Sequence, residues 1–410
     1  MQRVAITGIG LLAATGRGVD SFWDAVVRGA SALRSISRFD ASSYSCGIGG
    51  QVPDDIYDDL VAPRLLRTTT LSTRLALAAC ELALRDARLA PELYAPERRG
   101  IAVGTALGGW REGEQQYGIL VERGARRVNP FVANGAPNHA GGVELAAQVG
   151  AQGSHTTFTS GCPSSLQALS FAASQIAAGD LDFCIAGGFE APITQLVLAG
   201  LTRTQELSTL NESPERASRP FDRDHAGMVL SEASCLFVLE SEEAARRRNA
   251  RIRAFVLGSA TSCDAKGVYG IDPTGEPAAV ALRAAVLRSG LDATDIHYVC
   301  SHANSLAAFD KKEAIVLKRA FGEYVGRLPV SSIKGVTGHP FGASGALQTA
   351  AAVLALEHGL IPPTANLENR APECDLRLPA GEALAGDLRN ALVTSYGYGG
   401  VNSFLVVAAP

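Results

Sequence analysis

Lysine, methionine and tryptophan are scarce in this sequence of 410 residues, whereas glycine is abundant. Five of the 37 basic residues are lysines, and there are two methionines and two tryptophans against 43 glycines. A net charge of −4 and a pI of about 6.0 leave no excess of positive charge. The composition therefore gives no reason to expect a nucleic acid as partner.

Paired cysteines and long apolar runs are also missing. The eight cysteines are scattered without a C-x-x-C pair, which argues against a zinc site and a disulfide framework and indicates a reducing, cytoplasmic compartment. We therefore expect no metal. No apolar run approaches the roughly 20 residues of a membrane span, so we expect no membrane partner. Thr7, Gly8 and Gly10 interrupt the N-terminal apolar stretch, and we interpret residues 1–16 as a strand and a turn rather than a signal peptide.

The same glycines match a dinucleotide-binding fingerprint by letter. Residues 8–13 read Gly-Ile-Gly-Leu-Leu-Ala, which fits G-x-G-x-x-G/A. However, Gly16 and Gly18 break the segment where the phosphate-binding helix should run, and the next helix, at about residues 19–28, starts late. We therefore do not predict a nicotinamide site, and we expect no bound cofactor.

Strands and helices alternate along the chain, which predicts an α/β fold with mostly parallel sheets. The clearest helices are predicted at residues 71–87, 165–178, 277–288, 311–321 and 344–359. The clearest strands are predicted at residues 3–7, 101–105, 155–159, 182–186, 230–240, 251–261, 297–301, 329–333, 391–395 and 403–408. The order of elements is similar on each side of residue 250, so we predict two similar halves, residues 1–250 and 251–410.

Cys162 lies in the segment around which the other motifs are arranged. Residues 155–159 are β-branched and aromatic enough for a buried strand, Gly161 supplies a tight turn, and Pro163 suits the first position of a helix. Cys162 is therefore expected at a helix N-terminus, where backbone N–H groups and the helix dipole lower a thiol pKa. A buried structural cysteine is the alternative, and this local pattern leaves both open.

Further polar groups follow strands of the C-terminal half. His302 follows the strand at 297–301, whereas Lys334 and His339 follow the strand at 329–333. Sites in open α/β sheets form at the carboxyl ends of strands, so we expect these groups to meet Cys162. A thiolate can take an acyl group while neutral imidazoles donate to a developing enolate oxygen and glycine-rich backbone stabilises an oxyanion. Each histidine could instead have a structural role in its loop, and Lys334 could lie on the surface.

Longer motifs make a family resemblance specific. The motifs are TSGC at 159–162, AGGFE at 186–190, SRPFDRD at 218–224, SH at 301–302, DKKE at 310–313, SIKGVTGH at 332–339, GASGA at 342–346, PPTAN at 362–366 and SYGYGGVN at 395–402. With these motifs along essentially its whole length, the chain resembles the elongating β-ketoacyl-acyl carrier protein synthases and the ketosynthase subunits of type II polyketide systems. The intact Cys162 separates it from the family's inactive chain-length subunits, which lack the nucleophile.

The resemblance implies a thiolase-like fold, in which two similar halves form a five-layered α/β/α/β/α sandwich. It also implies a dimer, formed either with itself or with a related ketosynthase-like subunit. Cys162 would accept an acyl group from the phosphopantetheine of an acyl carrier protein. A malonyl-type extender would then lose CO2, and its enolate would attack the thioester. His302 and His339 would assist decarboxylation, with Lys334 as a further catalytic residue.

Other matched positions are implied to support this chemistry. The N–H groups of Cys162 and Tyr396 would form the oxyanion hole, and Tyr396, Gly397 and Tyr398 match the family's mobile gating loop. Asp310 and Glu313 match positions that support the first histidine loop. Leu107 and Leu201 match positions that line the acyl pocket. Carrier proteins are acidic, so an arginine patch should receive one. The candidates, which could also be ordinary solvated surface, are Arg64, Arg67, Arg123, Arg126 and Arg127.

The sequence departs from the family pattern in the half of the site that would hold the extender. The usual Gly-Thr-x-Thr after the first histidine is replaced by Ala-Asn-Ser-Leu at 303–306, so two hydroxyls are gone. A glutamate usually pairs with the lysine, but the matching residue here is Gln348, which can hydrogen-bond Lys334 without balancing its charge. Lys334 would then have a lowered pKa or another carboxylate partner. Cys162 is also followed by Pro-Ser-Ser at 163–165 rather than by the usual small residues.

Three functions remain open from the sequence. The first is a decarboxylating ketosynthase of fatty-acid, polyketide or polyene biosynthesis. The second is a non-decarboxylating acyltransferase in which Cys162 passes its acyl group to another nucleophile. The third is a non-catalytic partner subunit of a ketosynthase heterodimer, and the presence of Cys162, His302, His339 and Lys334 argues against it. The departures also leave room for an unusual extender.

Overall fold

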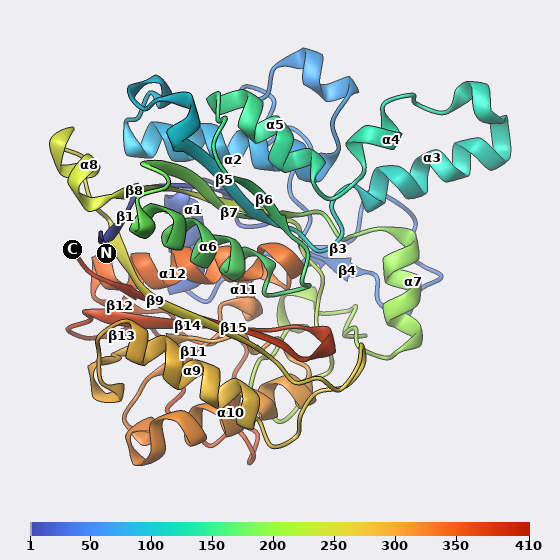
Figure 1. The fold of residues 1–410 in the computed structure, drawn as a ribbon. Coiled ribbons are helices and arrows are strands. Elements are labelled where there is room, and N and C mark those ends of the chain that lie inside the picture. Colours follow the sequence, from blue (N-terminus) through green and yellow to red (C-terminus); the bar gives the residue numbers. More distant parts are fainter. Residues whose placement is uncertain (1) are drawn as a thin grey trace.

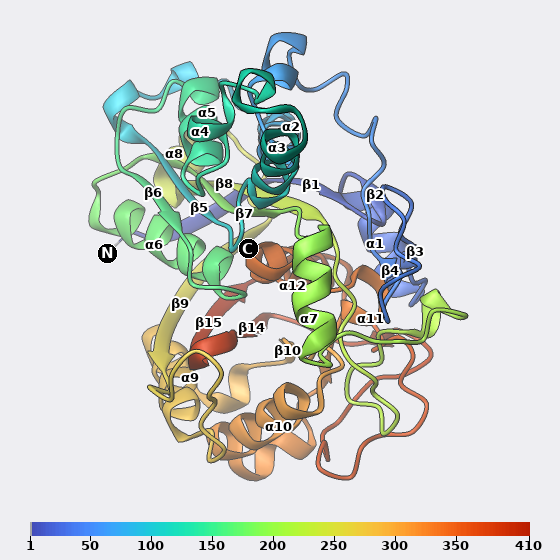
Figure 2. The same cartoon turned by 90° about the vertical axis from the view of Figure 1, so that its right-hand side faces the viewer.

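Helical layers and sheets alternate through the fold. In the computed structural model, which describes residues 2–410, helices cover both outer faces and fill the space between two groups of strands (Figure 1, Figure 2). The outer helices of the first sheet are α2 (Leu71–Ala87) and α5 (Ala140–Val149), the central helices are α6 (Ser164–Ala178) and α12 (Ser344–His358), and the outer helices of the second sheet are α9 (Glu276–Arg288) and α10 (Ala307–Phe321). This arrangement confirms the predicted α/β/α/β/α sandwich.

The same strand order occurs in both halves of the chain. In the N-terminal half it is β1 (Val4–Ala13), β8 (Ala233–Ser241), β7 (Phe183–Glu190), β5 (Arg99–Gly104) and β6 (His155–Phe158). In the C-terminal half it is β9 (Ala254–Cys263), β15 (Val401–Ala408), β14 (Asn390–Tyr396), β10 (Tyr298–Cys300) and β11 (Val330–Ser331). A short antiparallel pairing of β1 with β9 joins these two groups of strands, which we call the first and second sheets, into one continuous sheet. In each half the first three strands pair antiparallel and the last three pair parallel, so the prediction of mostly parallel sheets is wrong. An internal duplication explains this correspondence, and the division at residue 250 stays a prediction.

Short elements fill the connections. The short helices are α1 (Val19–Val27), α4 (Val132–Gly135), α7 (Gln195–Arg203), α8 (Glu242–Arg247) and α11 (Lys334–Thr337). The short strands are β2 (Gly16–Arg17), β3 (Arg34–Ser35), β4 (Ile48–Gly49), β12 (Leu360–Ile361) and β13 (Leu384–Ala385). Helix α3 (Trp110–Arg123) and α4 project from one end of the first sheet, and we call residues 110–135 the arm (Figure 1).

The glycines near the N-terminus have a different role from the one predicted. β1 continues through Gly8 and Gly10 to Ala13, so the strand is longer than the predicted residues 3–7, and the predicted turn follows at residues 14–15. A Cβ on Gly10 would lie 1.8 Å from the carbonyl oxygen of Ala79, and one on Gly8 would lie 2.3 Å from that of Ala83. These glycines therefore let α2 pack directly on β1, as close helix–sheet contact requires. Neither a phosphate-binding loop nor a chain reversal is formed here.

The strand before the nucleophile is not buried as predicted. His155 in β6 is exposed and the next three residues are half-buried. The reason is topological, since β6 is the last strand of its sheet and pairs, within residues 2–410, with β5. A β-branched sequence predicted the strand correctly, but it could not predict its place in the sheet.

The central helices are made of small side chains because sheets lie on both sides of them. Helix α12 is buried from Ser344 through Leu356, and its alanines belong to the same hydrophobic cluster as Leu166 and Leu169 of α6. This packing fixes the N-terminal ends of both helices, where the candidate site lies. Among the helices of residues 2–410, none has both the length and the apolar composition needed to cross a membrane.

Candidate active site

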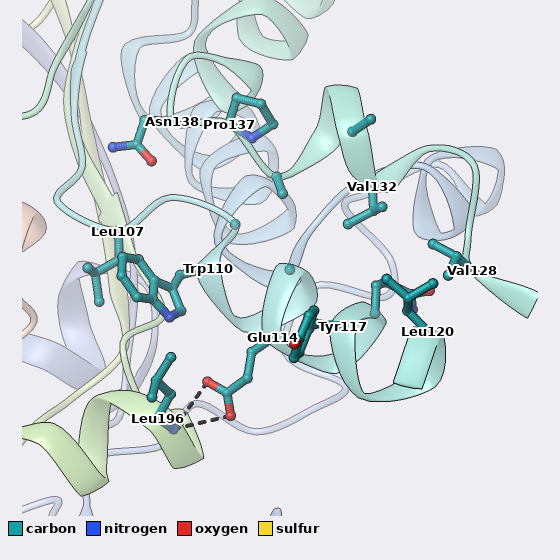
Figure 3. A pocket seen from close by; sticks show the side chains of 15 residues that line it. Leu107, Trp110, Glu114, Tyr117, Leu120, Val128, Val132, Pro137, Asn138 and Leu196 are labelled. Carbon is teal, nitrogen blue, oxygen red and sulfur yellow. Dashed lines mark hydrogen bonds between the residues drawn. The ribbon is translucent and has the colours of Figure 1, made fainter. Parts of the chain in front are cut away.

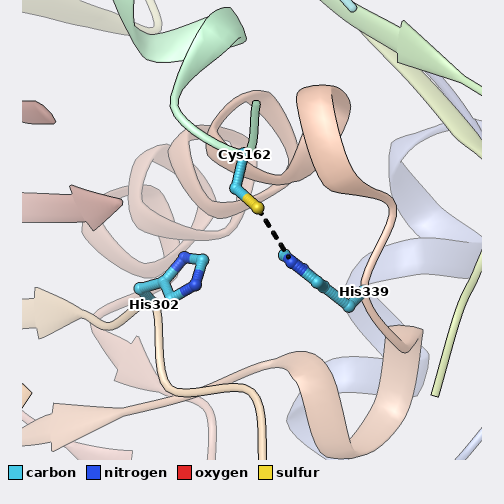
Figure 4. A group of neighbouring side chains, drawn as sticks. All are labelled: Cys162, His302 and His339. Atoms are coloured by element: carbon cyan, nitrogen blue, oxygen red, sulfur yellow. Dashed lines mark hydrogen bonds between the residues drawn. The ribbon is translucent and has the colours of Figure 1, made fainter. Parts of the chain in front are cut away.

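Cys162, His302 and His339 converge between the two halves of the molecule (Figure 4). The Sγ atom of Cys162 lies 3.2 Å from Nε2 of His339. One sulfur or ring-nitrogen atom from each of the three residues lies within 4.8 Å of the others. The two imidazole rings are nearly perpendicular, with centroids 5.3 Å apart and an interplanar angle of 88°. The structure thus brings together the residues that the sequence placed after three separate strands.

The nucleophile turn holds Cys162 just before helix α6. Gly161 has a φ of 75°, which favours glycine, and Pro163 precedes the helix rather than occupying its first position. The hydroxyl of Ser164 accepts a hydrogen bond from the backbone N–H of Ser160 at 2.9 Å and donates to the carbonyl of Gly161 at 2.6 Å. The turn is therefore closed on itself, and the thiol projects toward the histidines.

The predicted lowering of the Cys162 pKa is wrong. The residue is 3% exposed, and burial raises the pKa of its thiol to about 12. The charge of Lys334 and a backbone N–H favour the thiolate, but less than desolvation disfavours it. The resting thiol is therefore protonated, so that a base must take its proton when it reacts.

His339 is placed to take that proton. Burial lowers the pKa of His339 well below its usual range, so the ring is neutral. Its Nδ1 atom lies 2.9 Å from the hydroxyl of Ser344. The neutral tautomer that donates from Nδ1 to Ser344 leaves Nε2 as an acceptor facing Cys162. Ser344 opens helix α12, so the packed helix fixes the orientation of the ring.

His302 has a different environment, because its ring nitrogens find no hydrogen-bond partner within residues 2–410. The ring is fully buried against Phe309 and Tyr396, with both centroid distances at 5.8 Å. Burial, and then the charge of Lys334, lowers its pKa well below the usual range. A buried, neutral and unpaired imidazole has an unused hydrogen-bonding capacity that a bound ligand can satisfy.

Lys334 and Gln348 form the hydrogen bond that the sequence predicted between a lysine and an uncharged amide. Lys334 Nζ donates to Gln348 Oε1 at 3.1 Å and to the backbone carbonyl of His302 at 2.6 Å. No carboxylate in residues 2–410 lies within 4.0 Å of this ammonium group. Burial lowers the pKa of Lys334 to about 8. Of the two alternatives expected from the sequence, a lowered lysine pKa or another carboxylate partner, the structure supports the lowered pKa.

Two buried carboxylates hold the loop after His302. Asp310 accepts from the backbone N–H of Asn304 at 2.9 Å, and Glu313 accepts from that of Ala303 at 2.9 Å. Burial raises the pKa of Glu313 to about 7, against these hydrogen bonds. Both carboxylates come from α10, which starts directly after the loop. They lie where the motif placed them, beside the first histidine.

The glycine turn after β14 packs on the nucleophile turn. A Cβ on Gly397 would lie 2.7 Å from Cδ of Pro163 and 3.5 Å from the backbone nitrogen of Cys162, which explains the glycine. The hydroxyls of Tyr396 and Tyr398 are unpaired among the residues that the structure describes. Tyr396 lies edge-on to His302, so this turn forms one wall of the site.

The two predicted pocket residues differ in position. Leu107 lines a pocket of about 690 Å³ whose walls are mostly apolar (Figure 3). The apolar walls come mainly from the arm and from α7, through Trp110, Tyr117, Leu120, Val128, Val132 and Leu196. Leu201 does not line this pocket. It packs instead with Leu107 in the hydrophobic cluster that contains Cys162.

Glu190 is a site residue whose role the sequence did not reveal. Its buried carboxylate accepts hydrogen bonds from the backbone N–H groups of Ala106, Leu107 and Gly342, at 2.6, 3.1 and 3.0 Å, and from the hydroxyl of Thr105 at 3.0 Å. It therefore joins the loop of the pocket residue Leu107 to the segment after His339. The signals in the sequence were a glutamate ending a buried strand and the AGGFE motif at 186–190, but neither revealed its partners, which lie far away along the chain.

This fold, with a buried cysteine facing two histidines at strand ends, defines a thiolase-like enzyme that transfers acyl groups through a cysteine. Family models agree: "Beta-ketoacyl synthase, N-terminal domain" matches residues 1–245, and "Beta-ketoacyl synthase, C-terminal domain" matches residues 253–368. The chain belongs to the β-ketoacyl synthase family, whose members are condensing acyltransferases.

Relatives from polyketide and fatty-acid synthesis match over the full length. The tetracenomycin polyketide synthase ketoacyl synthase alpha subunit of Streptomyces glaucescens is 38% identical, with 100% of this chain and 97% of the relative covered. The 3-oxoacyl-[acyl-carrier-protein] synthase 2 of Coxiella burnetii is 34% identical, with 99% and 98% covered. Both kinds of relative support a condensing role for this chain in polyketide or fatty-acid biosynthesis.

Solved structures agree with the sequence relatives. The ishigamide ketosynthase/chain length factor has a TM-score of 0.93 at 27% identity, with 100% of this chain and 99% of that chain covered. A type II polyketide ketosynthase in complex with its acyl-carrier protein has a TM-score of 0.92 at 27% identity, with both chains fully covered. The fold is therefore that of the ketosynthases.

Proposed function

We propose that this enzyme joins a Cys162-bound acyl group to a malonyl-type extender with loss of CO2. The observation that carries the proposal is the 3.2 Å contact between Cys162 Sγ and His339 Nε2, beside a buried His302 whose ring nitrogens are unpaired in residues 2–410. One group supplies the nucleophile, and the other two supply proton transfer and hydrogen bonding. Family membership gives the reaction class, and the proposal assigns its steps to residues.

The first half-reaction loads the acyl group. His339 Nε2 takes the thiol proton, and the thiolate of Cys162 attacks the thioester carbonyl of an acyl-phosphopantetheine. The N–H groups of Cys162 and Tyr396 stabilise the tetrahedral oxyanion. The carbon–sulfur bond to phosphopantetheine then breaks, and the leaving thiolate takes the proton back from His339. The acyl group remains on Cys162 as a thioester, and His339 is neutral again.

The second half-reaction forms the new carbon–carbon bond. The carbon–carboxylate bond of the extender breaks, CO2 leaves, and the electron pair forms an enolate. Neutral His302 donates a hydrogen bond to the enolate oxygen, and so does Nε2–H of His339 in its other neutral tautomer, in which the Ser344 hydroxyl donates to Nδ1. The enolate carbon attacks the acyl carbonyl and the bond to Cys162 Sγ breaks, so the thiolate is regenerated and takes up a proton. The unpaired ring of His302 supports this role, because it needs a ligand to complete its hydrogen bonds.

The substrates are proposed to arrive on the phosphopantetheine of an acyl carrier protein. All five candidate arginines are exposed. Arg67 and Arg127 line one surface pocket, so the segments at 63–67 and 125–127 form a common basic face. An acidic carrier protein suits this face through complementary charge. The related ketosynthase that was solved with an acyl-carrier protein also supports the partner class.

A ketosynthase-like subunit is proposed as the second partner. The arm and the neighbouring α7 expose large apolar side chains, among them Tyr117 and Val121, each 68% exposed, and Leu196, 56% exposed. Such a cluster is typical of a surface covered by another subunit. A second copy or a related chain would fit, as the ketosynthase/chain length factor among the structural relatives illustrates.

Intact-protein mass spectrometry in two stages tests the proposed function. The enzyme is first incubated with acyl-carrier proteins of several chain lengths, with Cys162→Ala as the unreactive variant. Cys263→Ala is the matched control, because Cys263 is an exposed thiol that is not part of the Cys162–His302–His339 group and touches the glycine turn through the carbonyl of Gly399. Malonyl-carrier protein is then added, and CO2 loss and a product longer by two carbons are followed. We expect loading in wild type and Cys263→Ala, no loading in Cys162→Ala, and elongation after loading.

Two outcomes would contradict the proposal. Loading without elongation, also in the presence of candidate partner subunits, would favour a non-decarboxylating acyltransferase. A correctly folded enzyme that accepts no acyl group would favour a non-catalytic partner subunit.

A further inference from the structure

We propose that Gln348 is a positioning residue that leaves Lys334 without a charged partner, so that the charge of Lys334 controls the extender half-reaction. The inference rests on the proposed function, because it concerns the decarboxylation step at the same site. With a carboxylate in place of Gln348, the lysine would instead be held in a permanent ion pair.

The surroundings of Gln348 specify an amide. The residue is fully buried in α12, and its Nε2 donates to the carbonyls of Cys300 at 3.2 Å and Thr394 at 2.9 Å. Its Oε1 accepts from Lys334 Nζ at 3.1 Å. Carbonyl oxygens can only accept and a lysine ammonium group can only donate, so the network fixes which end of the amide points where. A carboxylate in this position would face two carbonyl oxygens.

The hydrogen bonds of Lys334 suit both of its charge states. Nζ donates to Gln348 Oε1 and to the His302 carbonyl, and both acceptors are uncharged. An ammonium group and a neutral amine can each make these two bonds, because the amine keeps two N–H donors. Burial, which lowers the pKa of Lys334 to about 8, is then not offset by a carboxylate in contact. The charge can change while the geometry stays the same.

Carboxylates near Lys334 have other partners. Asp310 and Glu313 accept from the backbone of the loop after His302 rather than from the lysine. The titratable groups that face Lys334 from the elements packed around it are Cys162, Cys300, His302, Asp310, Glu313 and His339. Of these, the carboxyl groups of Glu313 and Asp310 raise the pKa of Lys334 and so favour its ammonium form, whereas burial lowers it more. The ammonium form therefore persists up to about pH 8.

The charge matters most in the second half-reaction. The extender brings a carboxylate, and its enolate is also negative, whereas the acylated Cys162 is neutral. An ammonium group bonded to the backbone of His302 stabilises negative charge beside that imidazole, and a neutral amine does so far less. Starting from the acyl-enzyme also removes the influence of Lys334 on the free thiol. The extender step should therefore slow as Lys334 loses its proton.

The test is the rate of decarboxylation by isolated acyl-enzyme in a single turnover. Acyl-Cys162 enzyme is mixed with malonyl-carrier protein at a series of pH values from about pH 6 to about pH 10. The variants are Gln348→Leu, Gln348→Glu and Lys334→Arg, and Gln148→Leu on α5 is the matched control. We expect the wild-type rate to fall above about pH 8, by about tenfold per pH unit where the amine dominates.

The variants are expected to move this midpoint in opposite directions. Gln348→Leu removes an acceptor and should lower the midpoint by about one pH unit, whereas Gln348→Glu supplies a charge and should raise it. Lys334→Arg keeps its charge and should lose the alkaline fall. Gln148→Leu should behave as wild type. Because the two Gln348 shifts are opposite in sign, either variant that folds decides the question.

Failure of the inference and failure of the proposed function look different. A wild-type acyl-enzyme that releases no CO2 at any pH contradicts the proposed function. A wild type that decarboxylates, with a pH midpoint that the Gln348 variants leave unchanged, contradicts only the role of Gln348 and Lys334.

Discussion

The hydroxyl of Ser344 lies 2.9 Å from Nδ1 of His339, on the side of the imidazole ring opposite to Cys162. Because the ring is neutral and Nε2 faces the thiol, this contact selects the tautomer that can accept the thiol proton. Ser344 therefore acts on Cys162 through the orientation and protonation of His339, and it touches no proposed substrate atom.

Replacing this hydroxyl should slow acyl loading without unfolding the enzyme. In Ser344→Ala the Nδ1 proton loses its acceptor, at a cost of about 1 kcal/mol, which corresponds to about a fivefold slower loading of Cys162. The loading rate is measured by mass spectrometry of samples quenched at a series of times. Ser174→Ala on the exposed side of α6 is the control. Equal rates in the two variants would show that Ser344 does not orient the base.

Because α2 packs so closely on β1, we expect a single methyl group added at Gly10 to lower the free energy of unfolding strongly. In Gly10→Ala the added Cβ would lie 1.8 Å from the carbonyl oxygen of Ala79, which belongs to the helix backbone and cannot move alone. We expect a loss of about 3 kcal/mol or more in the free energy of unfolding. Gly113→Ala, where a Cβ would meet no atom within 4 Å, is the matched control. Chemical denaturation measures both, and similar stabilities would contradict the close contact.

The sequence predicted the bounds of helices and strands better than the packing around them. The helix at 71–87 was predicted with the observed bounds, because its apolar period and its ends are local features. The convergence of Cys162, His302 and His339 could also be predicted, since each follows the carboxyl end of a strand, where sites form in α/β sheets. Gly10 was wrongly predicted to interrupt the first strand, because its role depends on its contact with a helix that begins some 60 residues later rather than on its neighbours in the sequence.

Burial explains the remaining errors. The helix N-terminus was expected to lower the Cys162 pKa, but elements from both halves enclose the thiol, and desolvation outweighs the local N–H groups. No local pattern shows that enclosure. Glu190 was missed for a related reason, because its backbone donors come from Ala106, Leu107 and Gly342.

Glu190 should make stability depend on pH. Burial raises its pKa in the folded protein to about 7, from an ordinary value of 4.5. The folded state therefore holds the proton more tightly than the unfolded state. Its contribution to stability is fully present below about pH 4.5 and is lost as the pH rises through about 7, with a size on the order of 3 kcal/mol.

The substitution Glu190→Gln isolates this contribution, because the amide does not titrate. We expect the difference in free energy of unfolding between wild type and Glu190→Gln to shift against the wild type as the pH rises from about 4.5 to about 7. Urea denaturation at several pH values measures it. Glu97→Gln, at an exposed turn, should show no such trend. A pH-independent difference for Glu190 would mean that the four hydrogen bonds keep its pKa near the ordinary value.

The pocket beside Leu107 should set the length of the acyl chain. Leu107 packs in the cluster of Cys162 and also lines the apolar pocket of about 690 Å³, so we expect a chain that leaves the thioester to pass this side chain. In Leu107→Trp the larger ring would block the path, and we expect long acyl groups to load at least about tenfold more slowly, while acetyl loading stays within about twofold.

Competition between acyl-carrier proteins of different length, followed on Cys162 by mass spectrometry, measures this preference. Leu93→Trp is the control, because Leu93 is 61% exposed outside the pocket. If Leu107→Trp slowed all chain lengths equally, the defect would lie in the nucleophile turn rather than in the pocket. If it slowed none, the acyl chain would have to leave the site by a route that does not pass Leu107.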